Sequence, residues 1–244
     1  MMGTLYALSA QLHLKALMRL PAYWVPTLLF PAMLYIMFGS GTEPPRADYQ
    51  MASFVIYGMV GVAFFQFGVS IAQDRESRWE RYRRTLPGSL GPRIAAQLFS
   101  AIIFSLATGI LVIAVSFVLS SPSIDLVTVL TLLAATLVIS LPFTLLGIAL
   151  GYWSSAKSAV AIANLLYLPL AFLGGLWMPP NRLPETIAEL SWYTPTRHAA
   201  EIVWSIVGST PFPTQSAIWL LAFTVLFGAF AIWGYRRDEG FRYG

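Results

Sequence analysis

The sequence predicts an all-α membrane protein with six transmembrane helices. Its 244 residues are 57% hydrophobic and 11% charged, whereas soluble domains carry roughly 25% charged residues. The few charges are bunched, which leaves six long uncharged stretches. Each can supply the roughly 20 apolar residues with which a helix crosses a bilayer, and a helix satisfies its own backbone groups without water. The stretches are residues 20–42, 49–73, 94–124, 126–156, 158–181 and 202–235.

Residues 4–19 predict an amphipathic helix that lies in the membrane interface before the first span. Gln11, Lys15 and Arg19 recur every fourth residue on one face, and leucines occupy another face. A cytoplasmic extension of the first span is an equally good interpretation, although Pro21 favours a bend between the two. No small-residue cleavage pattern follows before Glu43, so we expect the first span to be retained.

The six spans are expected at about residues 22–39, 53–73, 95–119, 126–151, 158–177 and 215–235. Pro26 and Pro31 interrupt the first span. Neighbouring helices can satisfy the carbonyls that proline frees, so we predict that this span packs inside a bundle. Gly147 and Gly151 form a small-xxx-small pair in the fourth span. We interpret this pair as close helix packing within one chain, in preference to a subunit interface.

Between the fifth and sixth spans, residues 183–207 predict two short re-entrant helices that dip into the outer leaflet. Two amphipathic pieces, residues 183–192 and 196–207, are separated by prolines. The aromatic residues of this region are typical of a membrane interface. They are Trp177, Trp192, Tyr193 and Trp204.

The distribution of basic residues predicts the orientation. If the N-terminus is cytoplasmic, twelve of the fifteen Lys and Arg residues lie inside, and only Arg46, Arg182 and Arg197 lie outside. Both termini are therefore expected in the cytoplasm. This asymmetry accounts for the net charge of +4, so we expect no nucleic-acid partner.

Several kinds of chemistry are not expected. The chain has no cysteine, and His13 and His198 fall on opposite sides of the predicted membrane, so no metal site is expected. No G-x-x-x-x-G-K-[ST] phosphate loop and no G-x-S-x-G motif occur. We therefore expect no catalytic residue, no cofactor bound by this chain and no enzymatic activity.

The segment of residues 74–93 holds six of the fifteen basic residues, between the second and third spans. Asp74 with Arg78, and Glu80 with Arg84, are acid-before-base pairs four residues apart, which favour a short cytoplasmic helix. Trp79 lies among these charges and is typical of an anchor for a protein partner. The residues alone also allow a second interpretation, in which the arginines only fix topology and bind anionic lipid.

Two weaker candidate sites concern a transport pathway. Gln66 and Asn164 are the main amide side chains at membrane depth, where such groups usually face a protein partner or a wet cavity. Arg197, His198 and Glu201 lie on one helical stretch at the outer side and are candidates for an outer gate. A local salt bridge, with His198 and Glu201 three residues apart, is our preferred interpretation over a substrate contact.

The charged segment DRESRWERYRRTLP resembles the signature of ABC-2 type transporter permeases, in which a charged helix and a leucine-proline turn follow the second span. Arg78 stands where the family usually has glycine. Other similar features follow in the family's order and extend over nearly the whole chain, which is expected to be a single transmembrane domain, residues 1–244. They are Pro31 with Phe38-Gly39, Gly174-Gly175, Met178-Pro179, Leu183-Pro184, and Tyr193-Thr194-Pro195-Thr196 with His198.

The resemblance implies a permease subunit in the cytoplasmic membrane of a prokaryote. It would work with a second permease copy, as a homodimer or heterodimer, and with two copies of a separate ATP-binding cassette ATPase that binds ATP and Mg. The re-entrant outer helices would close the exit. The implied ATPase-coupling residues are Asp74, Arg75, Glu76, Arg78, Trp79, Glu80, Arg81 and Arg84.

The substrate is open, although the apolar lining favours a drug-like or amphipathic small molecule. The alternative is a secondary transporter or channel without an ATPase partner. Such proteins normally place ionisable groups inside their spans, and none of the six stretches contains one. A membrane scaffold that only anchors a cytoplasmic partner is a third interpretation.

Overall fold

The computed structural model describes residues 2–78 and 91–243, and the side chains of residues 4–78 and 91–238. Every regular element in these ranges is a helix. Five helical runs are long and apolar enough to cross a membrane. They are Pro21–Gly39, Arg46–Glu76, Gly91–Leu119, Leu126–Trp153 and Thr214–Asp238. The predicted all-α membrane protein is confirmed.

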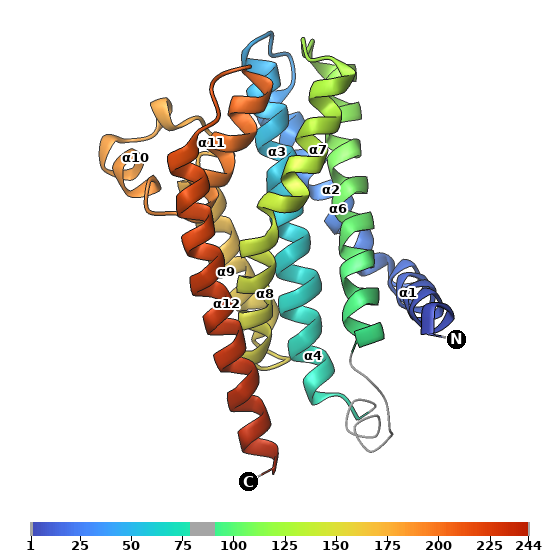
Figure 1. Cartoon of the computed structure of the whole chain (residues 1–244). Helices are drawn as coiled ribbons and strands as arrows, with labels where there is room; N and C mark the ends of the chain where they lie inside the picture. Colours follow the sequence, from blue (N-terminus) through green and yellow to red (C-terminus); the bar gives the residue numbers. More distant parts are fainter. Residues whose placement is uncertain (1, 79–90, 244) are drawn as a thin grey trace.

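One of these runs forms the middle of the bundle. It consists of α3 (Arg46–Val62), the π-helix η1 (Ala63–Val69) and α4 (Ser70–Glu76), and 83% of its most apolar part is buried. Among the described residues, seven other helices surround this run (Figure 1). They are α2 (Pro21–Gly39), α6 (Gly91–Leu119), α7 (Leu126–Ile139), α8 (Leu141–Trp153), α9 (Ala159–Leu173), α11 (Pro195–Val207) and α12 (Thr214–Tyr243). The last of them, α12, packs on the outer side of α8.

The N-terminal helix α1 (Met2–Met18) lies at the outer edge of the bundle and packs on α6 (Figure 1). It begins two residues before the predicted start. Leu20, with φ −109° and ψ 80°, separates α1 from α2. The bend predicted from Pro21 is therefore present.

The first span differs from the prediction, because α2 lies at the edge of the bundle. Only 28% of its most apolar part is buried, and Leu29, Met33 and Met37 are exposed. Pro31 faces inward, where its ring lies close to Gly58 of α3. Packing of this one face against α3 therefore supports the backbone that the prolines interrupt. The span does not need other helices on all sides.

The fifth predicted span is shorter than the expected residues 158–177. The helix α9 has 15 residues, which rise about 22 Å at 1.5 Å per residue, less than the roughly 30 Å of a bilayer core. It ends at a turn in which Gly175 has φ +77°. Such a backbone favours glycine, and it leads the chain out of the helix before Trp177.

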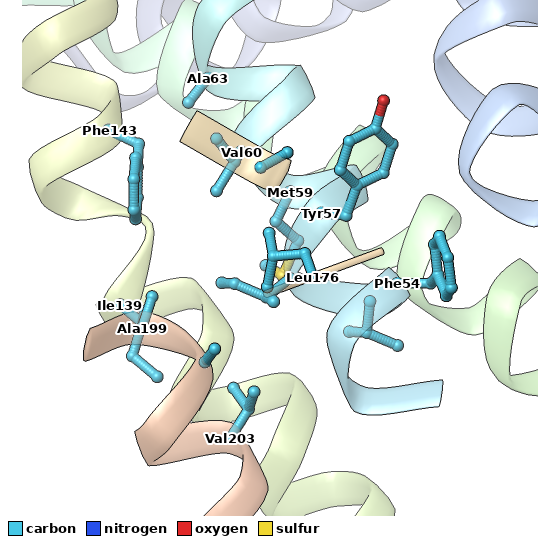
Figure 2. Packing of buried hydrophobic residues seen from close by; sticks show 14 of the residues in the cluster. Phe54, Tyr57, Met59, Val60, Ala63, Ile139, Phe143, Leu176, Ala199 and Val203 are labelled. Atoms are coloured by element: carbon cyan, nitrogen blue, oxygen red, sulfur yellow. The ribbon is translucent and has the colours of Figure 1, made fainter. Parts of the chain in front are cut away.

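The core of the bundle is built on α3 (Figure 2). Phe54, Tyr57 and Met59 are fully buried there and pack with residues of α7, α8 and α11. Tyr57 also stacks on Tyr167 of α9 at 4.8 Å between ring centroids. The Tyr167 hydroxyl donates a hydrogen bond to the Tyr57 carbonyl oxygen at 2.9 Å.

The π-helix η1 and α8 approach each other at the predicted glycine pair. A Cβ atom added to Gly147 would lie 2.5 Å from the Ala63 carbonyl oxygen, and one added to Gly151 would lie 2.7 Å from Cβ of Ile71. Only glycine permits this spacing, because real Cβ atoms do not come so close to such neighbours. The interpretation as packing within the chain is confirmed.

Both predicted helices are present in the segment between α9 and α12. The 3-10 turn η2 (Pro180–Arg182) leads into α10 (Glu185–Ser191), and α11 follows. Figure 1 shows α10 at the side of the bundle, whereas α11 packs against α3, α7 and α12. Their insertion into the outer leaflet stays a prediction.

Candidate functional site

The charged segment after the second span does not begin as one continuous helix. The helix α4 ends at Glu76, and Ser77 is extended, with ψ 145°. Nη2 of Arg93, at the start of α6, lies 2.7 Å from Oδ2 of Asp74. The predicted pair of Asp74 with Arg78 is therefore wrong, because the extended residue between them ends the helical spacing. Trp79, Glu80, Arg81 and Arg84 lie outside the described residues.

Arg75 points into the end of the bundle. Its Nη1 donates to the carbonyl oxygens of Gly151 at 2.7 Å and Tyr152 at 3.0 Å. These carbonyls belong to the last turn of α8, where a helix leaves acceptors without internal partners. Nε and Nη2 of Arg75 donate to the carboxylate of Asp238 on α12, a side chain that is only 8% exposed. One planar guanidinium with five donors thus joins α4, α8 and α12.

Glu76 makes a third connection. Its Oε1 accepts a hydrogen bond from the Ala156 backbone N–H at 2.9 Å, in the loop between α8 and α9. Asp74, Arg75 and Glu76 are consecutive residues, and each binds a different part of the chain. The beginning of the charged segment is therefore fixed to α6, α8, α12 and the α8–α9 loop.

His13 of α1 lies near this cluster. Burial lowers the pKa of His13, and the nearby Asp74 carboxylate partly offsets this effect. Nε2 of the imidazole is buried and has no hydrogen-bond partner in the described part of the chain. The ring is thus suited to its neutral form.

Gln66 is fully buried and joins three helices. Its Oε1 accepts a hydrogen bond from the Tyr23 hydroxyl at 3.1 Å, and its Nε2 donates to the Gln97 carbonyl oxygen at 3.1 Å. Gln97 returns a hydrogen bond from its own Nε2 to the Gln66 carbonyl oxygen at 3.0 Å. The amide predicted as a pathway group is therefore engaged in holding η1 to α2 and α6.

Asn164 is not brought together with Gln66. Its Nδ2 donates to the Val160 carbonyl oxygen at 3.0 Å, one turn back along α9. No hydrogen bond between the two amides occurs among the described residues. The two predicted pathway residues do not form one site here.

Arg197 forms the salt bridge at the outer side. Its Nη2 lies 2.6 Å from Oε1 of Glu201, so the local ion pair uses Arg197 and not His198. The guanidinium lies 4.7 Å from the Trp192 ring centroid and 5.5 Å from that of Trp204. Arg197 is 8% exposed, and its Nε and Nη1 are buried without a hydrogen-bond partner in the described residues. The two indole faces supply their electrostatic compensation.

His198 turns away from Glu201, toward α12. Its Nε2 lies 2.9 Å from the Trp192 carbonyl oxygen. A carbonyl oxygen only accepts, so Nε2 carries the proton, and Nδ1 accepts from the Ser216 hydroxyl at 3.2 Å. The ring stacks on Trp219 at 5.5 Å. His198 therefore joins the end of α10 to α11 and α12.

Three polar residues that join parts of the fold were not among the predicted site residues. Asp238 and Gln97 complete the contacts described above. Asp48, 4% exposed at the start of α3, accepts hydrogen bonds from the Ser123 backbone N–H at 2.8 Å and the Ser123 hydroxyl at 2.7 Å. Their position could have indicated them from the sequence, because each is a polar or acidic residue near the end of a span. No cluster of potential metal ligands occurs among the described residues.

Comparison with known proteins gives two matches. A family model described as "ABC-2 type transporter" matches residues 4–207. The chain is also similar to "Putative transport permease YvfS" of Bacillus subtilis (strain 168), with 24% identity over 239 residues. That alignment covers 93% of this chain and 95% of the relative.

Proposed function

The chain belongs to the ABC-2 type transporter family, and from that premise we propose that it is the permease subunit of an ATP-binding cassette exporter in the cytoplasmic membrane of a prokaryote. Two permease copies and two copies of a separate ATPase form the working complex. The ATPase binds ATP and Mg, and the permease provides the path for the substrate.

The proposal places the charged end of the bundle in the cytoplasm. Arg75, Arg93, Lys157 and Arg237 lie near the ends of α4, α6, α8 and α12 that meet there, and Figure 1 shows the C-terminus at this end. An excess of basic residues on one side is typical of the cytoplasmic face. This is also the side on which ATP is available.

The observation that carries the proposal is the attachment of residues 74–76 to four parts of the bundle. Asp74 binds Arg93 of α6, Arg75 binds α8 and α12, and Glu76 binds the α8–α9 loop. A partner that moves the segment beginning at Arg78 would therefore pull on several helices at once. In this proposal the ATPase docks on residues 78–84, and residues 74–76 transmit its motion.

Co-purification tests the partner. The tagged chain, purified from its native host, should retain an ATP-binding subunit, and Arg81→Glu with Arg84→Glu should release it. Arg182→Glu, a charge reversal at the exposed η2 turn, is the matched control and should have no effect. The proposal fails if no ATP-binding subunit accompanies the chain. If the double reversal leaves transport intact, the docking role of residues 78–84 is wrong.

The substrate in this proposal is a drug-like or amphipathic small molecule. The spans carry no ionisable side chain between their ends, and burying an unpaired charge in lipid is costly. ATP-dependent uptake of such a compound into inverted vesicles is the expected result. Uptake that follows an ion gradient without ATP would support a secondary transporter instead.

A further inference from the structure

A cavity of about 170 Å³ lies between α3, η1, α6 and the junction of α7 with α8. Its walls come from the middle of three spans. Ser105 is the central residue of α6, Ala63 lies near the middle of the run Arg46–Glu76, and Ser140 near the middle of Leu126–Trp153. The cavity is therefore at the level of the bilayer centre.

Two backbone irregularities lie beside this cavity, at the same level. The π-helix begins at Ala63, and the α-helical run breaks between α7 and α8 at Ser140, whose ψ is −12°. Pro142 follows this break and has no N–H to continue the ladder. π-Helical turns inside α-helices are frequent at functional sites.

The cavity opens toward the side of the bundle. Its deep wall includes Val62, 1% exposed, and Ala101, 8% exposed. Its mouth is lined by Leu98, Ile102 and Leu141, which are 43%, 45% and 50% exposed. Because the mouth is apolar and lies at mid-span, a ligand would enter from the hydrocarbon of the bilayer.

The Ser105 hydroxyl is the polar group in the cavity that indicates a ligand. Serines in membrane helices commonly bond back to a carbonyl of the preceding turn, and Ser100 and Ser116 of the same helix do so, to Ala96 and Ile113. Ser105 is 6% exposed and makes no hydrogen bond within the described part of the chain. A hydroxyl without a partner at this depth is costly.

The rest of the lining sets the chemistry of the ligand. The hydroxyls of Ser140 and Thr144 donate to the carbonyl oxygens of Leu137 and Ser140, so they can still accept. All other lining residues are apolar and none is charged. A charged group would lose its hydration there without compensation. An apolar cavity of about 150 Å³ is large enough for benzene.

We propose that this cavity binds the aromatic ring or short alkyl segment of an uncharged substrate that enters from the bilayer, with its hydroxyl or carbonyl group bonded to Ser105. The assignment as substrate rests on the proposed export function. The binding itself needs only this chain in a membrane.

Photolabelling tests the binding. The probes are a benzyl alcohol that carries a trifluoromethyl-diazirine group and the matched toluene, in which a methyl group replaces the hydroxymethyl group. With the full chain in phosphatidylcholine nanodiscs and no ATPase present, the alcohol should label peptides that contain residues 98–105 and 137–144. The labelling should saturate and should decrease with excess unlabelled benzyl alcohol.

Three variants make the test specific. Ala101→Leu fills the cavity and should abolish saturable labelling. In wild type, one hydrogen bond should make labelling by the alcohol stronger than labelling by the toluene, on the order of five-fold. Ser105→Ala should retain labelling by the toluene and abolish this preference for the alcohol. Ser116→Ala, a buried serine of the same helix that bonds back to Ile113, should behave as wild type.

Labelling that does not saturate, or an alcohol preference that persists in Ser105→Ala, would overturn the proposal. Because Ser105→Ala removes one atom, it decides the question even if Ala101→Leu fails to fold.

In the complex with the ATPase, benzyl alcohol should stimulate ATP hydrolysis in wild type and less in Ser105→Ala. Normal labelling with unchanged stimulation would assign the cavity to bilayer lipid and refute the substrate assignment. If no ATPase accompanies the chain, the export proposal fails, while the labelling result stands independently.

Discussion

At the scale of residues, the polar side chains that join helices of this membrane protein often bind backbone atoms of a neighbouring segment. Arg75 binds the carbonyls at the end of α8, Glu76 binds a backbone N–H, and the Gln66 and Gln97 side chains each donate to the other residue's backbone carbonyl. Such contacts satisfy groups that lipid cannot. Each of these side chains therefore stabilises the bundle by joining its own helix to a neighbouring segment.

Arg75→Ala tests the importance of one such contact. It would leave Asp238 as a largely buried carboxylate and remove the donors to Gly151 and Tyr152. We expect a loss of about 2 kcal/mol, within the range for hydrogen bonds to charged groups, measured by thermal unfolding in nanodiscs. Asp238→Asn in the same chain should recover part of the loss, because it removes a largely buried charge that the guanidinium no longer stabilises. Additive effects of the two substitutions would show that the pair is not coupled.

His13 gives a prediction for pH. Burial lowers its pKa in the folded chain below the ordinary value, which is about 6.5. As the pH falls through this value, the unfolded chain gains a proton that the folded chain resists, so stability should fall between pH 7 and pH 5. His13→Gln should flatten this part of the stability profile in a thermal unfolding series. An unchanged profile would mean that other groups dominate the pH dependence.

At the scale of elements, the contact between η1 and α8 depends on the absence of side chains. Gly147→Ala would place Cβ 2.5 Å from the Ala63 carbonyl oxygen, and a backbone atom cannot move aside as a flexible side chain can. The helices must separate, so we expect a loss of several kcal/mol and poor recovery of folded protein on size-exclusion chromatography. Gly228→Ala on α12 is the control, because its Cβ would meet its nearest neighbour, Leu145, at 3.6 Å. Equal behaviour of the two variants would contradict this account.

The same elements show what the sequence could predict. Charges are excluded from lipid, and five of the six uncharged stretches coincide with the long apolar helical runs. The length of α9 could not be found in this way, because the turn at Gly175 carries no charge. The π-helix is also invisible to composition. Arg75 and Asp238 are 163 positions apart in the sequence, so their pairing could not be predicted from a local pattern. The charged segment that contains Arg75 could be recognised in this way.

At the scale of the whole molecule, the proposed function requires that the charged end faces the ATPase. The connections of residues 74–76 would be useless for coupling if that end faced outward. The orientation was predicted from basic residues alone, and the arrangement of the helices brings Arg75, Arg93, Lys157 and Arg237 to one end. A direct measurement of sidedness is therefore the most general test of the model of function.

The absence of cysteine from the chain makes this measurement simple. Lys157→Cys, in the α8–α9 loop at the charged end, and Arg182→Cys, in η2 on the other side, each introduce a single thiol at an exposed position. A membrane-impermeant maleimide should label the Cys variant of Arg182 in intact cells with a permeable outer envelope, and that of Lys157 only after lysis. Neither substitution breaks a contact within the bundle described above, so both should fold. Labelling of the Lys157 variant in intact cells would place the attached segment outside the cell, where no ATPase could act on it, and would refute the coupling mechanism.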